Sequence, residues 1–488
     1  MSPSAPAPAD AQRQTPAPPT NGIDKFFKIS ERGSSVSREL RGGLATFFAM
    51  AYIVVLNPII LQTGEDKFHQ HLDHGQLVTA TALMAGLTTL LMGIIGNVPI
   101  ALAAGLGINA VVSLQLAPKM SWPDAMGMVV LAGLVLMILV ASGLRQRVMD
   151  AIPGGLRRAI AIGIGLFIAL IGLVDAGFVT RNPDKAKTSV PMGLGIEGKL
   201  QGWPVLIFVV GLALTFVLVV RKTRGAILIG IVAMTVAAIV INAAVDIPDG
   251  MWGLTVPDVP EQVVGTPDFG LIGDVSLFGG FHEVGILTGC LFVFTVLLSG
   301  FFDAMGTIIG VGEEAELTDE RGQLPGMGRI LMVDGIAVAG GGFGSASANT
   351  CFVESTAGVG EGARTGLANI VTGGLFLLAL VFTPLAQVVP SQAATPALVV
   401  VGFLIMAANV KEIDWSDFTI AIPAFLTMIS MPFTYSITNG IGIGVLAFLL
   451  LRIATRRTRE IPWLLGVVGL CFLVYFLLHP IEQALGAA

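Results

Sequence analysis

The stretch GSASANTCFVESTAGVG, residues 344–360, has the small residues of a buried membrane segment but also carries the carboxylate of Glu354. Its Ser, Asn and Thr side chains compete for backbone hydrogen bonds, which argues against a continuous helix. A second interrupted stretch, NVPIALAAGLGINAVVS at 97–113, contains Gly105 and Gly107, which allow an unwound backbone. Unwound backbone in a membrane is tolerated only where it lines a cavity or is buried in protein, so both stretches indicate a site inside the bilayer.

The composition is typical of a membrane protein. Of the 488 residues, 54% are hydrophobic and 12% are charged, whereas soluble domains average about 25% charged residues. Apolar runs of the roughly 20 residues that a spanning helix needs recur along the chain, which predicts a polytopic integral membrane protein. The net charge of -6 is spread over loops without a basic block, so we expect no nucleic acid as a partner. We expect no metal and no cofactor.

Fourteen apolar runs predict fourteen spans. They lie near 41–62, 77–96, 99–116, 124–144, 154–176, 203–220, 225–246, 284–311, 330–343, 345–360, 365–389, 395–409, 415–433 and 436–455. Lysines and arginines concentrate in alternate short loops, which predicts a cytoplasmic N-terminus, in what we expect to be a bacterial inner membrane. A further run at 462–478 is either a fifteenth span or, in the interpretation we favour, an accessory helix.

Seven spans followed by seven insert the second half from the opposite side, as in transporters built from inverted repeats. We therefore expect a first repeat at 25–246 and a second at 283–455, joined by an extracytoplasmic loop at 247–282. The Pro- and Ala-rich residues 1–24 predict a disordered tail, and 456–488 hold a basic loop and the accessory helix. The interrupted runs are third in each half, and such a pairing indicates a site near the bilayer midplane.

Within 284–312 and 330–360, three carboxylates fall inside apolar runs, where a charge costs about 2.5–3.5 kcal/mol on insertion scales. Asp334 stands near the entrance of its run beside Gly335, which favours a structural role. Asp303 follows two phenylalanines, and Glu354 stands two positions after Phe352. An aromatic face beside a carboxylate suits a flat heterocycle, because the ring stacks and the carboxylate accepts from its N–H groups. A carboxylate in a dry site also takes up and releases a proton near neutral pH.

The same interpretation assigns roles to the neighbouring polar residues. Asn109 is expected to cap or orient the half-helix that follows Gly105, and half-helix N-termini present positive dipole ends to a ligand. Backbone groups left open by the extended chain are expected to bond to Ser345, Ser347, Asn349 and Thr350. The alternative for either glycine-rich stretch is a helix-packing seam, since the chain contains 61 glycines.

Seven stretches carry a resemblance to a known family. They are TFFAMAYIVVLNPIIL (46–61), NVPIALAAGLGINA (97–110), FFDAMGTIIGV (301–311), LPGMGRILMVDGIA (324–337), FVESTAGVGEGARTGL (352–367), TPALVVVGFLIM (395–406) and DFTIAIPAFLTMISMPFTYSITNGIGIG (417–444). In order and spacing they resemble the azaguanine-type adenine/guanine/hypoxanthine permeases, a branch of the nucleobase–cation symporter (xanthine/uracil permease) superfamily.

The resemblance implies an all-α polytopic membrane protein with fourteen transmembrane segments in a 7+7 inverted repeat, like the uracil permeases. Segments 3 and 10 would contain short extended stretches that pair near the midplane. A core domain of spans 1–4 and 8–11 would slide against a gate domain of spans 5–7 and 12–14 in an elevator-like motion. The implied activity is uptake of purine nucleobases coupled to a proton, with sodium as the alternative ion, by a chain that forms homodimers in related members and is not an enzyme.

The family's two carboxylates match Asp303 and Glu354, which would grip the base and carry the proton. The full expected substrate-binding set is Tyr52, Gly105, Asn109, Asp303, Thr307, Thr350, Phe352, Val353 and Glu354. Ala104 replaces a family proline, and Phe352 replaces a family tyrosine. These departures leave the preferred base open among adenine, guanine, hypoxanthine and other flat heterocycles such as xanthine or uracil.

Two other functions fit the sequence less well. An anion transporter could share this architecture, but two carboxylates would repel an anion and no Lys or Arg lies in the interrupted stretches. An intramembrane protease needs a base beside its serine, and no His lies deep in a span. His282-Glu283 is not completed to the zinc motif HExxH, because Ile286 stands where the second His would be.

Overall fold

The structure is a computed structural model that describes residues 21–143, 152–181, 192–196, 198–245, 247–248, 251–252, 255–260, 262–318 and 324–484. The side chains of residues 302, 303, 305, 306 and 478–484 lie outside this description. So do residues 1–20 of the expected tail, whereas its last residues, 22–24, belong to the first helix.

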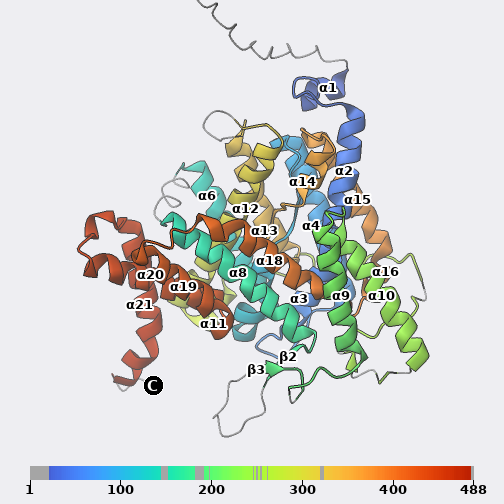
Figure 1. The fold of residues 1–488 in the computed structure, drawn as a ribbon. Coiled ribbons are helices and arrows are strands. Elements are labelled where there is room, and N and C mark those ends of the chain that lie inside the picture. Colours follow the sequence, from blue (N-terminus) through green and yellow to red (C-terminus); the bar gives the residue numbers. More distant parts are fainter. Residues whose placement is uncertain are drawn as a thin grey trace, which may run out of the picture.

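The helices and strands follow the order of the apolar runs (Figure 1). The first half contains α1 (Gly22–Phe27), α2 (Val36–Met50), α3 (Ile53–Gln62), α4 (His74–Leu91), the π-helix η1 (Met92–Gly96), β1 (Leu102–Ala104), α5 (Leu106–Val111), the π-helix η2 (Val112–Leu116), the 3-10 helix η3 (Ala117–Lys119), α6 (Trp122–Ala141), α8 (Gly154–Asp175), β2 (Val179–Arg181), β3 (Met192–Leu194), α9 (Trp203–Val220) and α10 (Ala226–Val245). The second half contains α11 (Gly279–Val284), α12 (Ile286–Glu314), α13 (Met327–Phe343), β4 (Asn349–Cys351), α14 (Ser355–Gly360), α15 (Gly366–Ala379), the 3-10 helix η5 (Leu380–Phe382), α16 (Thr383–Gln387), α17 (Ser391–Ala394), α18 (Pro396–Asn409), the 3-10 helix η6 (Val410–Glu412), α19 (Phe418–Thr434), α20 (Ile437–Ala454), the 3-10 helix η7 (Thr458–Glu460) and α21 (Trp463–Ala484).

Within the described ranges, nine helical stretches are long and apolar enough to cross a membrane, and α12, α19 and α21 contain shorter apolar stretches. This confirms a helical, polytopic architecture, while the count of fourteen crossings stays a prediction. The run at 462–478 lies in α21, which packs on α20 and α12. Whether α21 crosses the membrane also stays a prediction.

The two interrupted segments meet as a two-stranded antiparallel sheet, in which β1 pairs with β4. The backbone N–H of Gly105 donates to the carbonyl of Ala348 at 2.9 Å and extends the pairing by one residue. Each strand is followed by a helix of six residues, α5 in the first half and α14 in the second. The expected extended stretches in segments 3 and 10, and their pairing, are confirmed.

Neighbouring helices supply the partners for the exposed backbone of the first interrupted segment. On α4, Thr89 Oγ1 accepts from the N–H of Leu102 and donates to its carbonyl, both at 2.9 Å. On α15, the amide of Asn369 donates to the carbonyls of Val98 at 2.9 Å and Ile100 at 2.7 Å. Both side chains are buried. Because each extended stretch leaves its outer edge unpaired, these side chains replace the missing strand neighbours.

The expectation that the polar residues of the second segment satisfy loose backbone groups is mostly wrong. Ser347 Oγ and Thr350 Oγ1 are buried without a hydrogen-bond partner among the described residues. Asn349 donates to a threonine hydroxyl on α4, and only Ser345 donates to a backbone carbonyl, that of a distant loop. The anchoring residues sit instead on ordinary helices, where an isolated Asn or Thr gives no sequence signal.

Asn369→Leu is expected to destabilise the fold. It leaves two buried carbonyls without donors, at about 1–3 kcal/mol for each carbonyl. We expect a lower melting temperature in detergent than for Asn409→Leu, the matched control, because Asn409 is only part-buried and donates to a carbonyl of its own helix. Equal losses in the two variants would contradict the anchoring role of Asn369.

Helix α13 approaches the second interrupted segment at Gly341. A Cβ atom built on Gly341 would lie 2.1 Å from the carbonyl oxygen of Ser347 and 2.7 Å from the backbone nitrogen of Asn349. No other residue fits at that separation, so the glycine sets how closely the helix supports the extended chain.

The largest buried apolar cluster connects α3, α4, α6 and α12 with α8 and α18. Helix α8 packs along both α18 and α19, and these lie together on one side of the molecule in Figure 1. On the other side, α15 packs against α2 and α4. The paired strands thus lie between two groups of helices, and the apolar core continues from one group to the other.

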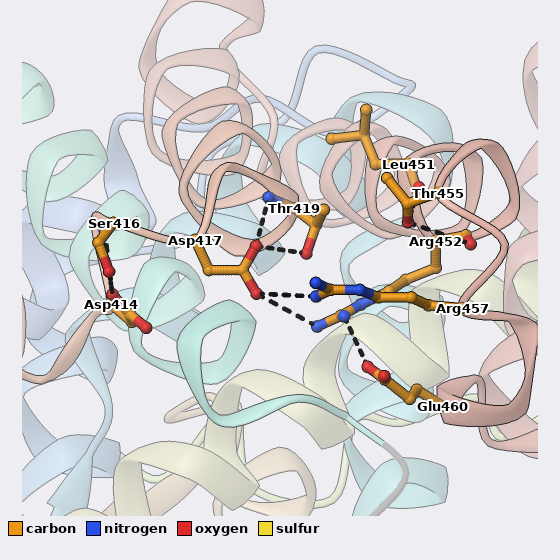
Figure 2. A network of polar contacts seen from close by, with 9 residues as sticks. All are labelled: Asp414, Ser416, Asp417, Thr419, Leu451, Arg452, Thr455, Arg457 and Glu460. Atoms are coloured by element: carbon orange, nitrogen blue, oxygen red, sulfur yellow. Dashed lines mark hydrogen bonds and ion pairs between the residues drawn. The ribbon is translucent and has the colours of Figure 1, made fainter.

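Charged residues fix the ends of α19 and α20 near the chain's basic cluster (Figure 2). Asp417 caps α19 by accepting from the backbone N–H of Thr419 at 2.9 Å and from its hydroxyl at 2.7 Å. The other carboxylate oxygen, Asp417 Oδ2, lies 3.5 Å from Arg457 Nη1 and 3.9 Å from Arg452 Nη2. The bonds from Thr419, reinforced by the two arginine charges, lower the pKa of Asp417. Arg452 also pairs with Glu460 at 2.6 Å.

Candidate functional site

A cavity of about 100 Å³ lies where the two interrupted segments face α8 and α18. Its walls come from both halves of the chain: the junction before α3, the start of α5, the end of β4 and start of α14, α12, α8 and α18. The lining residues are Tyr52, Gly105, Leu106, Gly107, Ile108, Ile160, Ala161, Ile164, Ile168, Ser299, Thr307, Cys351, Phe352, Val353, Glu354, Val401 and Ile405. Most are apolar, with one carboxylate among them.

Glu354 is held at the edge of this cavity by Tyr52. The carboxylate immediately precedes α14 and makes no capping bond to that helix. The Tyr52 ring is buried, and its hydroxyl donates to Glu354 Oε1 at 2.5 Å. No cation pairs with Glu354 among the described residues. The carboxylate is therefore oriented by a neutral donor and keeps acceptor capacity for a second partner.

Six of the nine expected substrate-binding residues line the cavity. They are Tyr52, Gly105, Thr307, Phe352, Val353 and Glu354. Asp303 lies within α12, but its side chain is outside the described residues. The structure therefore brings six of the expected residues to one cavity, while the meeting of Asp303 with Glu354 stays a prediction.

Asn109 and Thr350 do not line the cavity. Asn109 lies inside α5, fully buried, and neither atom of its amide has a partner among the described residues. The N-cap of α5 is Gly105, with no side-chain bond, so the expected capping role of Asn109 is wrong. Thr350 is buried in β4, where its methyl group would lie 2.9 Å from a Cβ atom built on Gly105.

Asp334 also lies outside the cavity, buried on α13 beside β4. Cys351 Sγ lies 3.8 Å from its Oδ1. This contact fits the structural role favoured for Asp334 from the sequence.

Sequence reasoning missed the apolar wall opposite the interrupted segments. It consists of Ile160, Ala161, Ile164 and Ile168 on α8 with Val401 and Ile405 on α18. These residues sit in apolar runs and look the same as lipid-facing positions. The one local signal is a glycine on each helix, Gly165 and Gly402, since a Cβ atom on Gly165 would lie 2.8 Å from the carbonyl of Gly402. Such close approach is typical of packed membrane helices.

The arrangement suits a flat molecule with polar edges. Phe352 and the isoleucines of α8 offer apolar faces, on which a ring stacks or packs. Glu354, Ser299 and Thr307 bring hydrogen-bonding groups to the lining. No lysine or arginine lines the cavity among the described residues, so nothing described there would neutralise an anion.

The chain is similar in sequence to known permeases. A family model described as the Permease family matches residues 37–443. The guanine/hypoxanthine permease PbuG of Bacillus subtilis is 37% identical over 462 residues, which cover 93% of this chain and 99% of that protein. The adenine permease AdeQ of Escherichia coli is 35% identical over 93% of this chain and 96% of that protein.

A solved structure supports the fold. The transmembrane domain of the cyanobacterial bicarbonate transporter BicA is similar with a TM-score of 0.56 and 16% sequence identity. The similarity covers 84% of this chain and 97% of that chain.

Proposed function

We propose a transport function for this chain, which belongs to the Permease family. The chain is a secondary active transporter that takes up purine nucleobases together with protons. Its relatives carry the names of guanine/hypoxanthine and adenine permeases and match it along nearly their whole length, which supports a purine substrate. The observation that carries the proposal is Glu354, an oriented carboxylate without a cation partner among the described residues, at the edge of a largely apolar cavity.

The base lies between Phe352 and the α8 wall, with its N–H edge toward Glu354. Tyr52 keeps that carboxylate aimed at the cavity, and Thr307 offers a hydroxyl to the ring's heteroatoms. Asp303 is assigned as the second acceptor on sequence grounds alone. A charge-assisted bond to an N–H donor is about twice as strong as a neutral one, so the carboxylate supplies much of the selectivity for N–H-bearing rings.

The same carboxylate couples transport to protons. An ionised carboxylate without a cation is costly to carry through a dry interface, by several kcal/mol. The ionised Glu354 first accepts the base, and a proton then adds to it. The Glu354 side chain is then neutral, so the loaded site moves more easily than the empty site with Glu354 ionised. Sodium is the alternative coupling ion.

The motion separates two groups of spans. The interrupted segments, α3 and α12 belong to the expected core, and α8 and α18 to the expected gate. The cavity lies on the boundary between these groups, which supports an elevator-like movement of core against gate. The transporter works in a bacterial inner membrane with its N-terminus in the cytoplasm, and homodimers are expected from the family.

One alternative concerns the substrate. Phe352 stands where the family has a tyrosine, which removes a hydroxyl from the cavity and weakens the discrimination among purines. Xanthine or uracil, which are also flat and carry N–H groups, would fit the same walls. An anion is disfavoured by the absence of a described cation at the cavity.

Uptake into proteoliposomes tests the proposal. Purified protein is reconstituted, and labelled hypoxanthine, guanine, adenine, xanthine and uracil are compared under an imposed inward proton gradient. We expect a purine to accumulate above its external concentration, and a protonophore to remove that accumulation while a sodium gradient has no effect. Accumulation driven by sodium alone would overturn the proton assignment, and uptake of none of these bases would overturn the function.

A further inference from the structure

A second cavity, of about 170 Å³, lies away from the candidate site between α6, α12 and the start of α21. Only aliphatic and phenylalanine side chains line it among the described residues, including Leu139, Phe294, Leu465 and Val468. A cavity without polar groups stays dry, because water would find no hydrogen-bond partner there. The part of any occupant that fills it must therefore be apolar.

The end of α20 and the loop before α21 carry positive charge that described acidic residues only partly neutralise. Four arginines stand within eight residues, at 452, 456, 457 and 459. Arg452 and Arg457 are paired with acidic side chains, as Figure 2 shows. Arg456 and Arg459 are exposed, and none of the ion pairs found among the described residues includes either of them.

Trp463 marks the level of the membrane surface at this place. It is the first residue of α21 and is 78% exposed, and exposed tryptophans at helix ends are typical of the lipid headgroup region. Arg459 precedes it, and the cavity residues Leu464 and Val468 follow it. The Cα atoms of Arg459 and Leu464 lie at most about 18 Å apart, since the two residues are five positions apart in the chain. A phosphate beside Arg456 and Arg459 and an acyl chain in the cavity are thus within the reach of one phospholipid molecule.

We infer that α21 and its neighbours form a binding site for one anionic phospholipid, with an acyl chain in the apolar cavity and the phosphate beside Arg456 and Arg459. Guanidinium groups match phosphate oxygens in geometry as well as charge. A zwitterionic lipid offers the same acyl chain without the net negative charge. Two cations near a membrane surface correspond to a preference of about 30-fold for the anionic lipid.

The headgroup half of the site is tested by lipid titration. Delipidated full-length protein in detergent is mixed with phosphatidylglycerol or phosphatidylcholine, and bound lipid is counted by native mass spectrometry. We expect wild type to prefer phosphatidylglycerol about 30-fold, and the double variant Arg456→Gln, Arg459→Gln to lose that preference. The matched control Arg41→Gln, Lys411→Gln removes two exposed cations elsewhere and should keep it. A full preference in the first double variant overturns the proposal.

The cavity half is tested by filling it. Val468→Trp should remove the bound lipid of both classes, whereas Val467→Trp should not, because Val467 is 48% exposed and does not line the cavity. Unchanged phosphatidylglycerol binding to Val468→Trp overturns the inference. The inference would also be overturned if the delipidated wild-type protein is a dimer and the Val468→Trp variant is a monomer. In that case a second copy of the chain, not a lipid, would cover this face.

Discussion

Glu354→Gln is expected to reduce purine uptake in proteoliposomes to the level of empty vesicles. The amide cannot ionise, so it cannot release the proton that couples transport. It also replaces a charged acceptor by a neutral one, and the difference of about 1–1.5 kcal/mol between the two kinds of hydrogen bond weakens binding about 5–13-fold. Tyr52 can still donate to the amide oxygen, so the local fold should be retained.

The measurement combines uptake with a purine-dependent thermal shift. Glu412→Gln is the matched control, because it makes the same change at an exposed ion pair with Arg158, and neither of these two residues lines the cavity. We expect that variant to transport like wild type. Normal concentrative uptake by Glu354→Gln, with an unchanged dependence on the proton gradient, would remove Glu354 from the coupling mechanism.

The sequence predicts the interrupted segments well, because their departure from helical pattern is local. Glycines at 105 and 107, and a polar run ending in Glu354, stand out within apolar surroundings. Pairing of the two extended stretches could be expected from the family resemblance. The structure adds the register of β1 and β4 and the bond from Gly105 to Ala348.

Sequence reasoning fails where a role depends on a distant neighbour. Asn369 and Thr89 look like scattered polar residues on apolar helices, yet they bond to the backbone of the first interrupted segment. Asn109 is a residue type that often caps helices, but here it lies about one turn beyond the N-cap position, because the helix begins at Leu106. The partner of a buried polar group is fixed by tertiary packing, which a single sequence does not encode locally.

The interrupted segments have one side bonded to helices and another side that faces the cavity, and this explains how such irregular chain can form a binding site. The extended chain at the cavity is supported from behind by α4, α13 and α15, whereas its front faces α8 and α18. Bonds to the supporting helices are polar and directional, while the front contacts described at the cavity are mostly apolar. Apolar contacts have no directional preference, so we propose that the front is the surface along which the two groups of spans slide.

Joining Gly107→Cys to Ile164→Cys by a disulfide is therefore expected to stop transport. A Cβ atom built on Gly107 would lie 2.6 Å from Ile164 Cγ2, which brings the two Cβ atoms within about 4.1 Å, inside the range of disulfides. The bond would tie α5 in the expected core to α8 in the expected gate. In a background with Cys290, Cys351 and Cys471 replaced by alanine, we expect oxidation to reduce uptake to background and reduction to restore it.

A second cysteine pair serves as the control. It distinguishes loss of transport because the core cannot slide from loss of transport because a cross-link damages the fold. Gly211→Cys with Met234→Cys connects α9 to α10, where a Cβ atom on Gly211 would lie 2.9 Å from Met234 Cγ. Both helices belong to the expected gate and should move together, so this cross-link should leave uptake largely intact. Cross-linking of both pairs is verified by mass spectrometry on the oxidised protein. If the oxidised Gly107–Ile164 pair transports as well as the oxidised gate pair, the core does not slide along α8, and the cavity must open by another movement.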